Sequence, residues 1–448
     1  MKDLTKGKPS SLILSFAFPI FLANLLQLTY SLADTRIVGS FLGEDALAAV
    51  GSTSTVSNLI IGFLLGLANG FAIITAQRFG AKDIKGMKKS FAASILLGTG
   101  ISIVLTVLGM IFKNTLLGFL NVPHNLYGEA GAYIFIIIAG MTATFLYDSC
   151  AAVLRSLGDT ITPLIILLVS VALNITGDLF FVVVLKSGVS GAAIATVLAQ
   201  IIAFVICFIY MFKKYEILRL TKSDFTSLDG NLVRNMLGSG LSMGFMSSLV
   251  NIGSLTLQTA INKLGQDIIV AHTAARKISE MFMIMFTVFG QTMATYCGQN
   301  MGAGRIDRVK TGIKSALIYT CSWCVLTVIA SYTIGDWLIY LVTGSNNENV
   351  IRNAVNYLKF DTVFYFVTAF ICILRNAMQG LGEHIIPLVS SSLEMVGKII
   401  IAATLVPWLG YAGVIVAEPI VWFIMVIPLI IQILKMIPVL EKQYGSPV

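Results

Sequence analysis

Four polar residues lie inside or at the end of apolar stretches of this sequence, and together they could hold a cation. Asp34 closes the first stretch, and Asn174 and Asp178 lie four residues apart in the fifth, which puts both on one helical face. Thr196 lies in the sixth stretch after several small residues, which let helices approach closely. Carboxylate, amide and hydroxyl oxygens are hard ligands that suit Na+, and the same carboxylates could carry protons instead. The alternative is a purely structural hydrogen-bond network.

Two further residues bear on this candidate ion site. Asp148, in the fourth stretch, is a third carboxylate that could take part in cation or proton coupling, and its alternative role is to pair with Arg155, seven residues further on. Pro19 lies inside the first stretch, where a proline removes a backbone hydrogen bond and kinks a helix. Because the same stretch carries Asp34, a hinge at Pro19 could couple ion binding to a shape change, whereas a static kink is the alternative.

A second set of residues could line a cavity for organic molecules. Methionine adapts to varied partners and aromatic faces attract organic cations. The candidate substrate-binding residues are Gln27, Tyr30, Tyr147, Asn251, Gln258, Met281 and Met285. Glu418 could be a proton site or a counter-charge for a cationic substrate, and its alternative role is packing or an internal ion pair. Packing or lipid contact is the alternative role of the methionines.

The composition is that of a membrane protein. Hydrophobic residues make up 56% of the chain, charged residues only 12%, and the mean hydropathy is +0.87, whereas a soluble domain carries about 25% charged residues. Apolar stretches long enough to span a bilayer recur along the chain, and we predict an all-α fold with about twelve transmembrane helices. The stretches are Ser10–Ala33, Ala48–Ala76, Phe91–Phe112, Ala130–Leu154, Ile161–Leu185, Gly191–Phe212, Met236–Leu264, Ile268–Cys297, Gly312–Val342, Val350–Met378, Ile385–Leu409 and Ala412–Met436.

The two halves of the chain repeat one another. Gln77 and the Gly80-Ala81 pair return 222 positions later as Gln299 and Gly302-Ala303, and Leu42-Gly43 returns as Leu264-Gly265. Gly188 and Gly191 return as Gly410 and Gly413, and Leu157-Gly158-Asp159 returns as Leu381-Gly382-Glu383. An even number of spans in each half predicts a parallel repeat, an architecture used by transporters that rock one half against the other. We predict an N-terminal lobe over residues 1–215, a cytoplasmic linker over 216–235 and a C-terminal lobe over 236–448.

The basic residues predict the orientation. Lys and Arg gather before the first stretch, after the second, after the sixth and after the eighth, whereas the loop Gly43–Leu47 has none. Because basic loops mark the cytoplasmic side, both termini are predicted to be cytoplasmic in a multi-pass protein of the inner or plasma membrane. The same bias explains the net charge of +8, so we expect no nucleic-acid partner.

Catalytic motifs are scarce. The three histidines form no metal or triad spacing, and no phosphate-binding loop is present. We therefore predict that the chain is not an enzyme and binds no cofactor besides a coupling ion, so that an ion gradient must supply the energy for transport. The six cysteines fall in or beside apolar stretches and are expected to pack in the core.

Several of these runs resemble the multidrug and toxic compound extrusion (MATE) family. The resemblance lies in the run from Asp34 through Leu42-Gly43 to Val50, in Gln77 with Gly80-Ala81, in Leu154–Asp159 before Pro163, and in Gly298–Ala303 before Arg308. It covers nearly the whole chain, in the family's order, and the DinF-like branch matches best.

The resemblance implies two six-helix bundles in a V around a central cavity, and efflux of organic, often cationic, compounds in exchange for Na+ or H+. It implies that Asp34, Asn174, Asp178 and Thr196 form the coupling site and that Pro19 is the hinge of the first helix. Asp148 stands where the family usually has Asn, which leaves the ion and its stoichiometry open. We expect a monomer in the lipid bilayer. A flippase for lipid-linked precursors in the same superfamily is the alternative function, and an integral-membrane enzyme is a more distant one.

Overall fold

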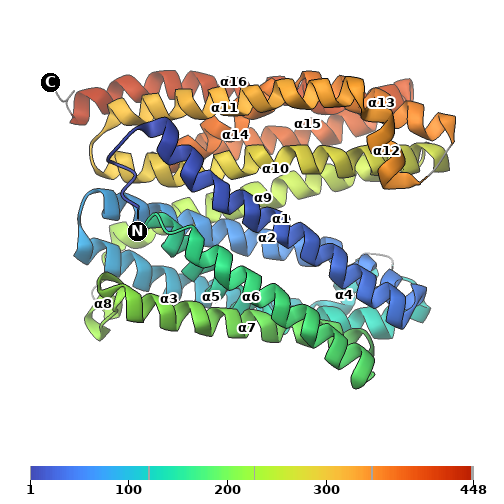
Figure 1. Ribbon diagram of the computed structural model, residues 1–448, viewed down its shortest axis with the longest axis horizontal. Coiled ribbons are helices and arrows are strands. Elements are labelled where there is room, and N and C mark those ends of the chain that lie inside the picture. The colour runs from blue at the N-terminus through green and yellow to red at the C-terminus, as the bar shows by residue number, and fades with distance from the viewer. Residues whose placement is uncertain (1, 120–121, 227, 345–346, 445–448) are drawn as a thin grey trace. The chain divides into compact units, whose positions relative to one another are not determined.

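The computed structural model describes residues 2–119, 122–226, 228–344 and 347–444, and within these the chain forms helices and no strand (Figure 1). Residues 1 and 445–448, at the outer ends of the two predicted lobes, and residue 227 of the predicted linker lie outside the described part. The all-α prediction is confirmed. The helices are α1 (Pro9–Leu42), α2 (Glu44–Gly80), α3 (Ile84–Ile111), α4 (Lys113–Phe119), α5 (Tyr127–Ser156), α6 (Ile161–Asp178), α7 (Gly188–Lys214), α8 (Lys222–Thr226), α9 (Gly230–Ile261), α10 (Gln266–Gly302), α11 (Ile306–Thr333), α12 (Gly335–Thr343), α13 (Glu348–Val363), α14 (Tyr365–Gly380), α15 (Ile385–Leu409) and α16 (Tyr411–Tyr444).

Most of the long helices are apolar enough to cross a membrane. Among the described residues ten helices meet that criterion, and α13 with α14 makes an eleventh span that is bent by 53°. Helix α10 is also long, but Arg276, Lys277 and Glu280 interrupt its apolar sequence, and it is not among the eleven. The predicted stretches Gly312–Val342 and Val350–Met378 each prove to be two helices rather than one, with breaks at Ile334 and Phe364.

The chain divides into two compact units. Unit 1 comprises Met1–Asp3 and Phe18–Gly244, and unit 2 comprises Leu4–Ala17 and Phe245–Val448. The division passes through two helices, because α1 begins in unit 2 and continues in unit 1, whereas α9 begins in unit 1 and continues in unit 2. In α1 the boundary between the units falls between Ala17 and Phe18. The predicted hinge, Pro19, follows directly; it lies inside the helix and is buried.

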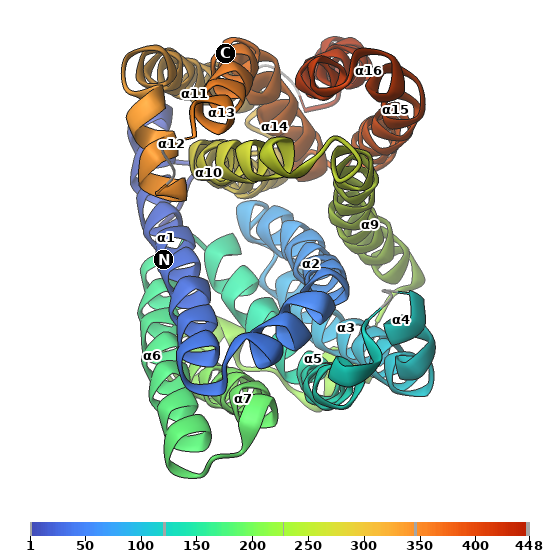
Figure 2. The same ribbon diagram turned by 90° about the vertical axis from the view of Figure 1, so that its right-hand side faces the viewer.

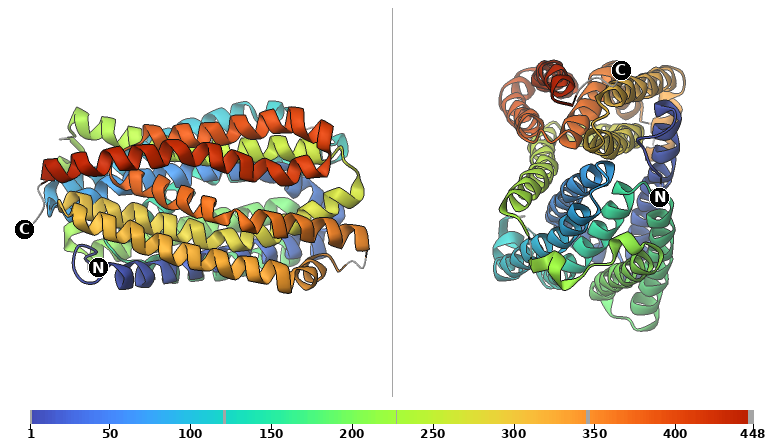
Figure 3. Two further views of the ribbon diagram at one scale, coloured as in Figure 1. Left: turned by 90° about the horizontal axis from the view of Figure 1, so that it is seen from above. Right: turned by 90° about the vertical axis from the view of Figure 1, so that its left-hand side faces the viewer.

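Corresponding helices pair within each unit. Helix α6 packs along α7 in unit 1, and α15 packs along α16 in unit 2 (Figure 2). Helix α5 packs against both α2 and α7, and in unit 2 α10 packs against α14. Helix α16 runs along the length of its unit (Figure 3). Each unit therefore has its own helix-on-helix core, as expected from a duplicated chain.

The repeated turns at residues 157–159 and 381–383, each of which ends in an acidic residue, have the same structure in the two units. Gly158 and Gly382 adopt φ of +83° and +89°, a backbone conformation that favours glycine. The acid that follows caps the next helix, because Asp159 accepts a hydrogen bond of 3.0 Å from the Thr162 amide and Glu383 accepts one of 2.9 Å from the Ile385 amide. Capping satisfies amides that have no partner inside the helix. The repeat in the sequence thus encodes a repeated helix start.

The N-terminal segment Leu4–Ala17 is held in unit 2 by the second repeat. The Gln299 side chain accepts a hydrogen bond of 2.9 Å from the Leu4 amide. Arg308 donates to the Gly7 carbonyl at 2.8 Å and to the Leu4 carbonyl at 3.1 Å. These contacts explain why the start of α1 belongs to unit 2 although the rest of the helix belongs to unit 1.

Candidate functional site

Helices α6 and α7 approach closely where the predicted ion site lies. A Cβ added at Gly177 would lie 3.0 Å from the Ala195 Cβ, so glycine is what permits this spacing. Asn174 and Asp178 lie on the same face of α6, and both are buried. The close contact brings Thr196 of α7 onto that face, as the small residues around it predicted.

The Asn174 amide links the two helices. It lies 3.1 Å from the Thr196 hydroxyl, and in the orientation that satisfies the hydrogen-bond network its NH2 group donates to Asp178 Oδ2 at 2.9 Å. The Thr196 hydroxyl also lies 3.1 Å from the Ala192 carbonyl and 3.4 Å from the Tyr30 hydroxyl. Four side chains from α1, α6 and α7 are thereby joined in one network.

Asp34 of α1 completes this cluster. Its carboxyl group lies within hydrogen-bonding reach of the Asp178 carboxyl group. Asp178 is fully buried, and one oxygen of each carboxyl group, Oδ1, has no hydrogen-bond partner among the described residues. Two carboxylates this close cannot both remain ionised unless a bound cation or a shared proton offsets the repulsion. We name Asp34 and Asp178 the carboxylate pair.

The structure adds one residue that the sequence did not reveal. Tyr133 of α5 lies close enough to Asp34, Asp178 and Tyr30 to interact electrostatically with all three. Its phenol brings a fourth helix to the cluster. A lone tyrosine near the start of an apolar stretch is common at membrane interfaces, so the sequence carried no signal that would have singled it out.

Two other expectations in unit 1 concern residues outside the carboxylate pair. Asp148 lies on α5, where its main electrostatic neighbour is Arg155, and Arg155 donates a hydrogen bond of 3.1 Å to Asn69. Within the described residues no hydrogen bond or ion pair joins Asp148 to the carboxylate pair. Tyr147 is buried in the core, whereas Gln27 is exposed. Of the predicted substrate residues in this unit, only Tyr30 belongs to the cluster.

The predicted substrate residues of unit 2 have mixed surroundings. Asn251 and Met281 are exposed, Met285 is partly buried, and Gln258 donates to Asn262 at 2.9 Å. The structure does not draw these four into one cluster by hydrogen bonds between them.

Glu418 lies in a buried ion-pair network in unit 2. Arg276 Nη1 reaches both of its carboxylate oxygens, at 3.0 and 3.1 Å, and Tyr357 donates to it at 3.3 Å. Lys398 lies 3.5 Å from Glu418 and 3.0 Å from Glu394. Glu394 and Lys398 lie four residues apart on α15, so theirs is an ion pair within one helix. The negative charge of Glu418 is thus already matched inside the protein.

The donor set fits a monovalent cation better than a transition metal. The described residues contain no group of three or more His, Cys, Asp or Glu side chains placed to share a metal ion. The carboxylate pair, the Asn174 amide and the Thr196 hydroxyl offer oxygen ligands alone, which suit a hard cation, and the two oxygens without partners are available to it. The six cysteines are free thiols.

These features define a multi-pass membrane protein of two repeated helical units, the first of which holds the carboxylate pair, with Asp178 buried and Asp34 partly buried. Comparison with known families agrees, because the MatE family model matches the chain twice, over residues 19–180 and 242–404. The chain therefore belongs to the MatE family, whose members are transporters and not enzymes. The two matches begin 223 residues apart (242 minus 19), close to the 222-residue offset of the repeat.

Several known proteins are similar to the chain over most of its length. "Probable multidrug resistance protein YpnP" from Bacillus subtilis is 28% identical over 417 residues, which is 92% of each chain. "Probable multidrug resistance protein YoeA" from the same organism is 28% identical over 76% of this chain and 71% of its own. The crystal structure of a MATE protein in its bent conformation superposes with a TM-score of 0.91 at 22% identity, over 99% of this chain and 98% of that one. The predicted family and fold class are confirmed.

Proposed function

We propose that this protein is a secondary active multidrug efflux transporter that exports small organic compounds in exchange for a cation bound at the carboxylate pair. The efflux activity is supported by family membership and by the relatives named as multidrug resistance proteins. The exchange is supported by one observation above all: Asp34 and Asp178 lie within hydrogen-bonding reach of each other, and each keeps one oxygen without a partner in the described part of the chain. Na+ and H+ are the two ions whose chemistry these groups accept.

The coupling follows from how the site is built. Its ligands come from α1, α6 and α7, so a cation between the carboxyl groups draws α1 toward α6, and the loss of the cation restores the repulsion between Asp34 and Asp178. Helix α1 crosses from one unit to the other just before Pro19, where the missing backbone hydrogen bond makes bending easier. A bound ion can shift the equilibrium between two conformations only by its difference in affinity for them. This difference in affinity arises because Asp34 lies on α1: the cation binds both carboxyl groups only in the conformation that brings α1 close to α6.

The basic residues at the start of the chain and after the second, sixth and eighth apolar stretches support a cytoplasmic location of both termini, in the inner or plasma membrane. Most substrates are cationic, and the protein acts as a monomer. In this proposal Glu418 and its partners stabilise unit 2, and Asp148 is not a ligand of the coupling ion.

Dye efflux from proteoliposomes tests the exchange. Purified protein is reconstituted with a cationic dye inside, and sodium and pH gradients are imposed separately. One of the two gradients should drive efflux, and Asp34→Asn and Asp178→Asn should each slow it by about ten-fold or more, since coupling between two sites commonly reaches that size. Asp148→Asn is the matched control and should keep most of the activity. Undiminished efflux in both Asp34→Asn and Asp178→Asn would overturn the proposed site.

A further inference from the structure

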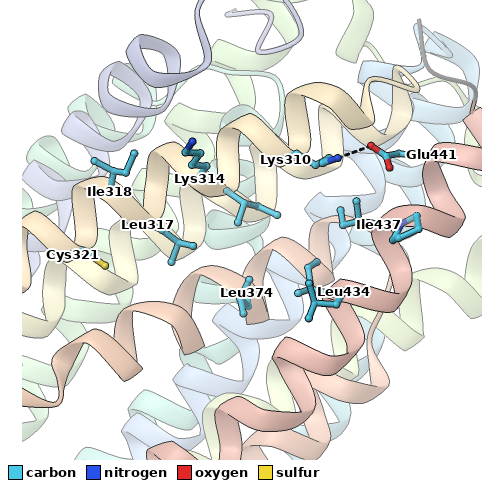
Figure 4. A pocket seen from close by; sticks show the side chains of 12 residues that line it. Lys310, Lys314, Leu317, Ile318, Cys321, Leu374, Leu434, Ile437 and Glu441 are labelled. Atoms are coloured by element: carbon cyan, nitrogen blue, oxygen red, sulfur yellow. Dashed lines mark hydrogen bonds and ion pairs between the residues drawn. The ribbon is translucent and has the colours of Figure 1, made fainter.

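Unit 2 carries an apolar groove that the transport site does not use. It lies between α11, α14 and α16 and has a volume of about 580 Å³. Leu317 and Ile318 of α11 form one wall, Leu434 and Ile437 of α16 form the other, and Leu374 of α14 forms the floor (Figure 4). The lining is aliphatic over most of its length.

The rims of the groove are exposed although they are apolar. Ile318 is 55% exposed and Leu434 is 68% exposed. Both lie on helices that are long and apolar enough to cross the membrane. On such helices an exposed aliphatic side chain contacts hydrocarbon rather than water. The groove therefore opens to lipid, and an acyl chain is what fills it without leaving a void.

One end of the groove is polar and positively charged. Lys310 of α11 and Glu441 of α16 form an ion pair of 2.9 Å across that end (Figure 4). Lys314, one turn further along α11, also lines the groove and is exposed, and no ion pair to it is found among the described residues. The three charges leave a net charge of +1, which favours an anionic headgroup.

The length of the groove matches one leaflet of a bilayer. Its lining on α11 runs from Lys310 to Cys321, and eleven residues of helix rise about 16 Å. The hydrocarbon core is about 30 Å thick, so the groove spans about half of it. Lysine near a helix end extends its ammonium toward the headgroups, which places Lys314 at the level of a lipid phosphate.

We propose that this groove is a binding site for an anionic phospholipid, with an acyl chain between α11 and α16 and the headgroup phosphate on Lys314. Glu441 limits the affinity, because it neutralises Lys310. In the orientation proposed above, the basic end of the groove lies on the cytoplasmic side, so the lipid belongs to the cytoplasmic leaflet. The lipid site itself does not depend on that orientation or on ion-coupled transport.

Native mass spectrometry of delipidated protein in mild detergent tests the site. Dioleoyl phosphatidylglycerol and dioleoyl phosphatidylcholine are titrated in equal amounts, and the wild type should retain the anionic lipid in preference. Lys314→Gln should reduce this preference by about five-fold, the effect of one lysine near an anionic surface. Glu441→Gln should increase the preference for phosphatidylglycerol, because this substitution frees the Lys310 ammonium.

Two variants on α16 separate the groove from general surface effects. Leu434→Trp fills the groove and should abolish retention of the first bound phosphatidylglycerol. Ile431 lies on the same helix, is 48% exposed and does not line the groove. Ile431→Trp should therefore leave lipid retention unchanged. Lys435→Gln removes an exposed charge outside the lining and is the control for Lys314→Gln. Equal retention of the two lipids by the wild type would overturn the proposal. Equal effects of Lys314→Gln and Lys435→Gln would also overturn it, and so would equal effects of the two tryptophan variants.

Discussion

Arg276 on α10 holds Glu418 on α16 through two hydrogen bonds, at 3.0 and 3.1 Å, although the residues lie 142 positions apart. Glu418 is 5% exposed and Lys398, its second cationic neighbour, is 3% exposed. A carboxylate with these partners joins four helices, α10, α13, α15 and α16, and has little charge left for a substrate. The sequence left Glu418 open as a counter-charge for a substrate, whereas the tertiary structure supports its alternative role in an internal ion pair.

The first prediction concerns this pair. Arg276→Met should lower stability by about 3–5 kcal/mol, because it leaves a buried carboxylate without its main partner. The double variant Arg276→Met/Glu418→Gln should be less destabilised than Arg276→Met alone. Thermal unfolding in detergent is the measurement. Arg305→Met removes an exposed pair with Asp307 and should leave the melting temperature nearly unchanged. If Arg276→Met behaves like Arg305→Met, the network does not stabilise unit 2.

The second prediction concerns Thr196. Its hydroxyl contacts both Asn174 and Tyr30, so Thr196→Val should weaken cation binding at the carboxylate pair by about five-fold or more, the cost of one lost hydrogen bond of about 1 kcal/mol. Thr196→Ser keeps the hydroxyl and should restore binding. Isothermal titration with Na+, or proton release measured with a dye, provides the readout. Equal binding by the valine and serine variants would show that the hydroxyl is not a ligand.

The third prediction is a pH dependence of stability at Asp159, which lies in a loop outside the spans. Burial opposes ionisation of its carboxyl group, but hydrogen bonds from Tyr215 and Thr162 outweigh it and lower the pKa below the ordinary value of 3.8. A lowered pKa in the folded state adds stability above pH 3.8, and this stability is lost as the pH falls through the folded-state value.

Asp159→Asn should therefore cost about 1.5–3 kcal/mol near neutral pH, the range for hydrogen bonds to a charged group. The difference from the wild type should shrink below about pH 4. Thermal unfolding between pH 7 and pH 3 measures both. Tyr215→Phe removes one of the hydrogen bonds and should give a smaller effect of the same sign. A difference that stays constant over this range would rule out ionisation of Asp159 as the cause.

The fourth prediction uses two glycines of α2. A Cβ at Gly66 would lie 2.5 Å from the Met243 carbonyl oxygen of α9, whereas a Cβ at Gly51 would have open space around it. Gly66→Ala should cost about 1–3 kcal/mol because two backbones must separate. Gly51→Ala should be neutral or stabilise by up to about 1 kcal/mol, since alanine favours a helix. Similar melting temperatures for the two variants would contradict the close crossing of α2 and α9 within unit 1.

Much of the architecture could be read from the residues. Runs of apolar residues give the helices, because a backbone in lipid must satisfy its own hydrogen bonds. Gly158 and Gly382 mark matching turns of the two repeats, because few residues other than glycine adopt the positive φ angles of these turns. Asn174 and Asp178 share a face because helix geometry fixes the spacing of four. The breaks at Ile334 and Phe364 were missed, since the apolar runs continue across them.

Tertiary structure decided which distant residues meet. The sequence predicted Asp34 and Asp178 as members of one site, but their carboxyl groups come within hydrogen-bonding reach only because α1 approaches α6. The contact between Gly177 and Ala195 sets the approach of α6 to α7. Helix packing likewise decides three other features. It pairs Glu418 with Arg276, it keeps Asp148 apart from the carboxylate pair, and it forms the groove between Lys314 and Leu434. Local spacing follows from backbone geometry within one helix, whereas these contacts follow from how side chains on several helices fit together, and no single stretch of sequence encodes that fit.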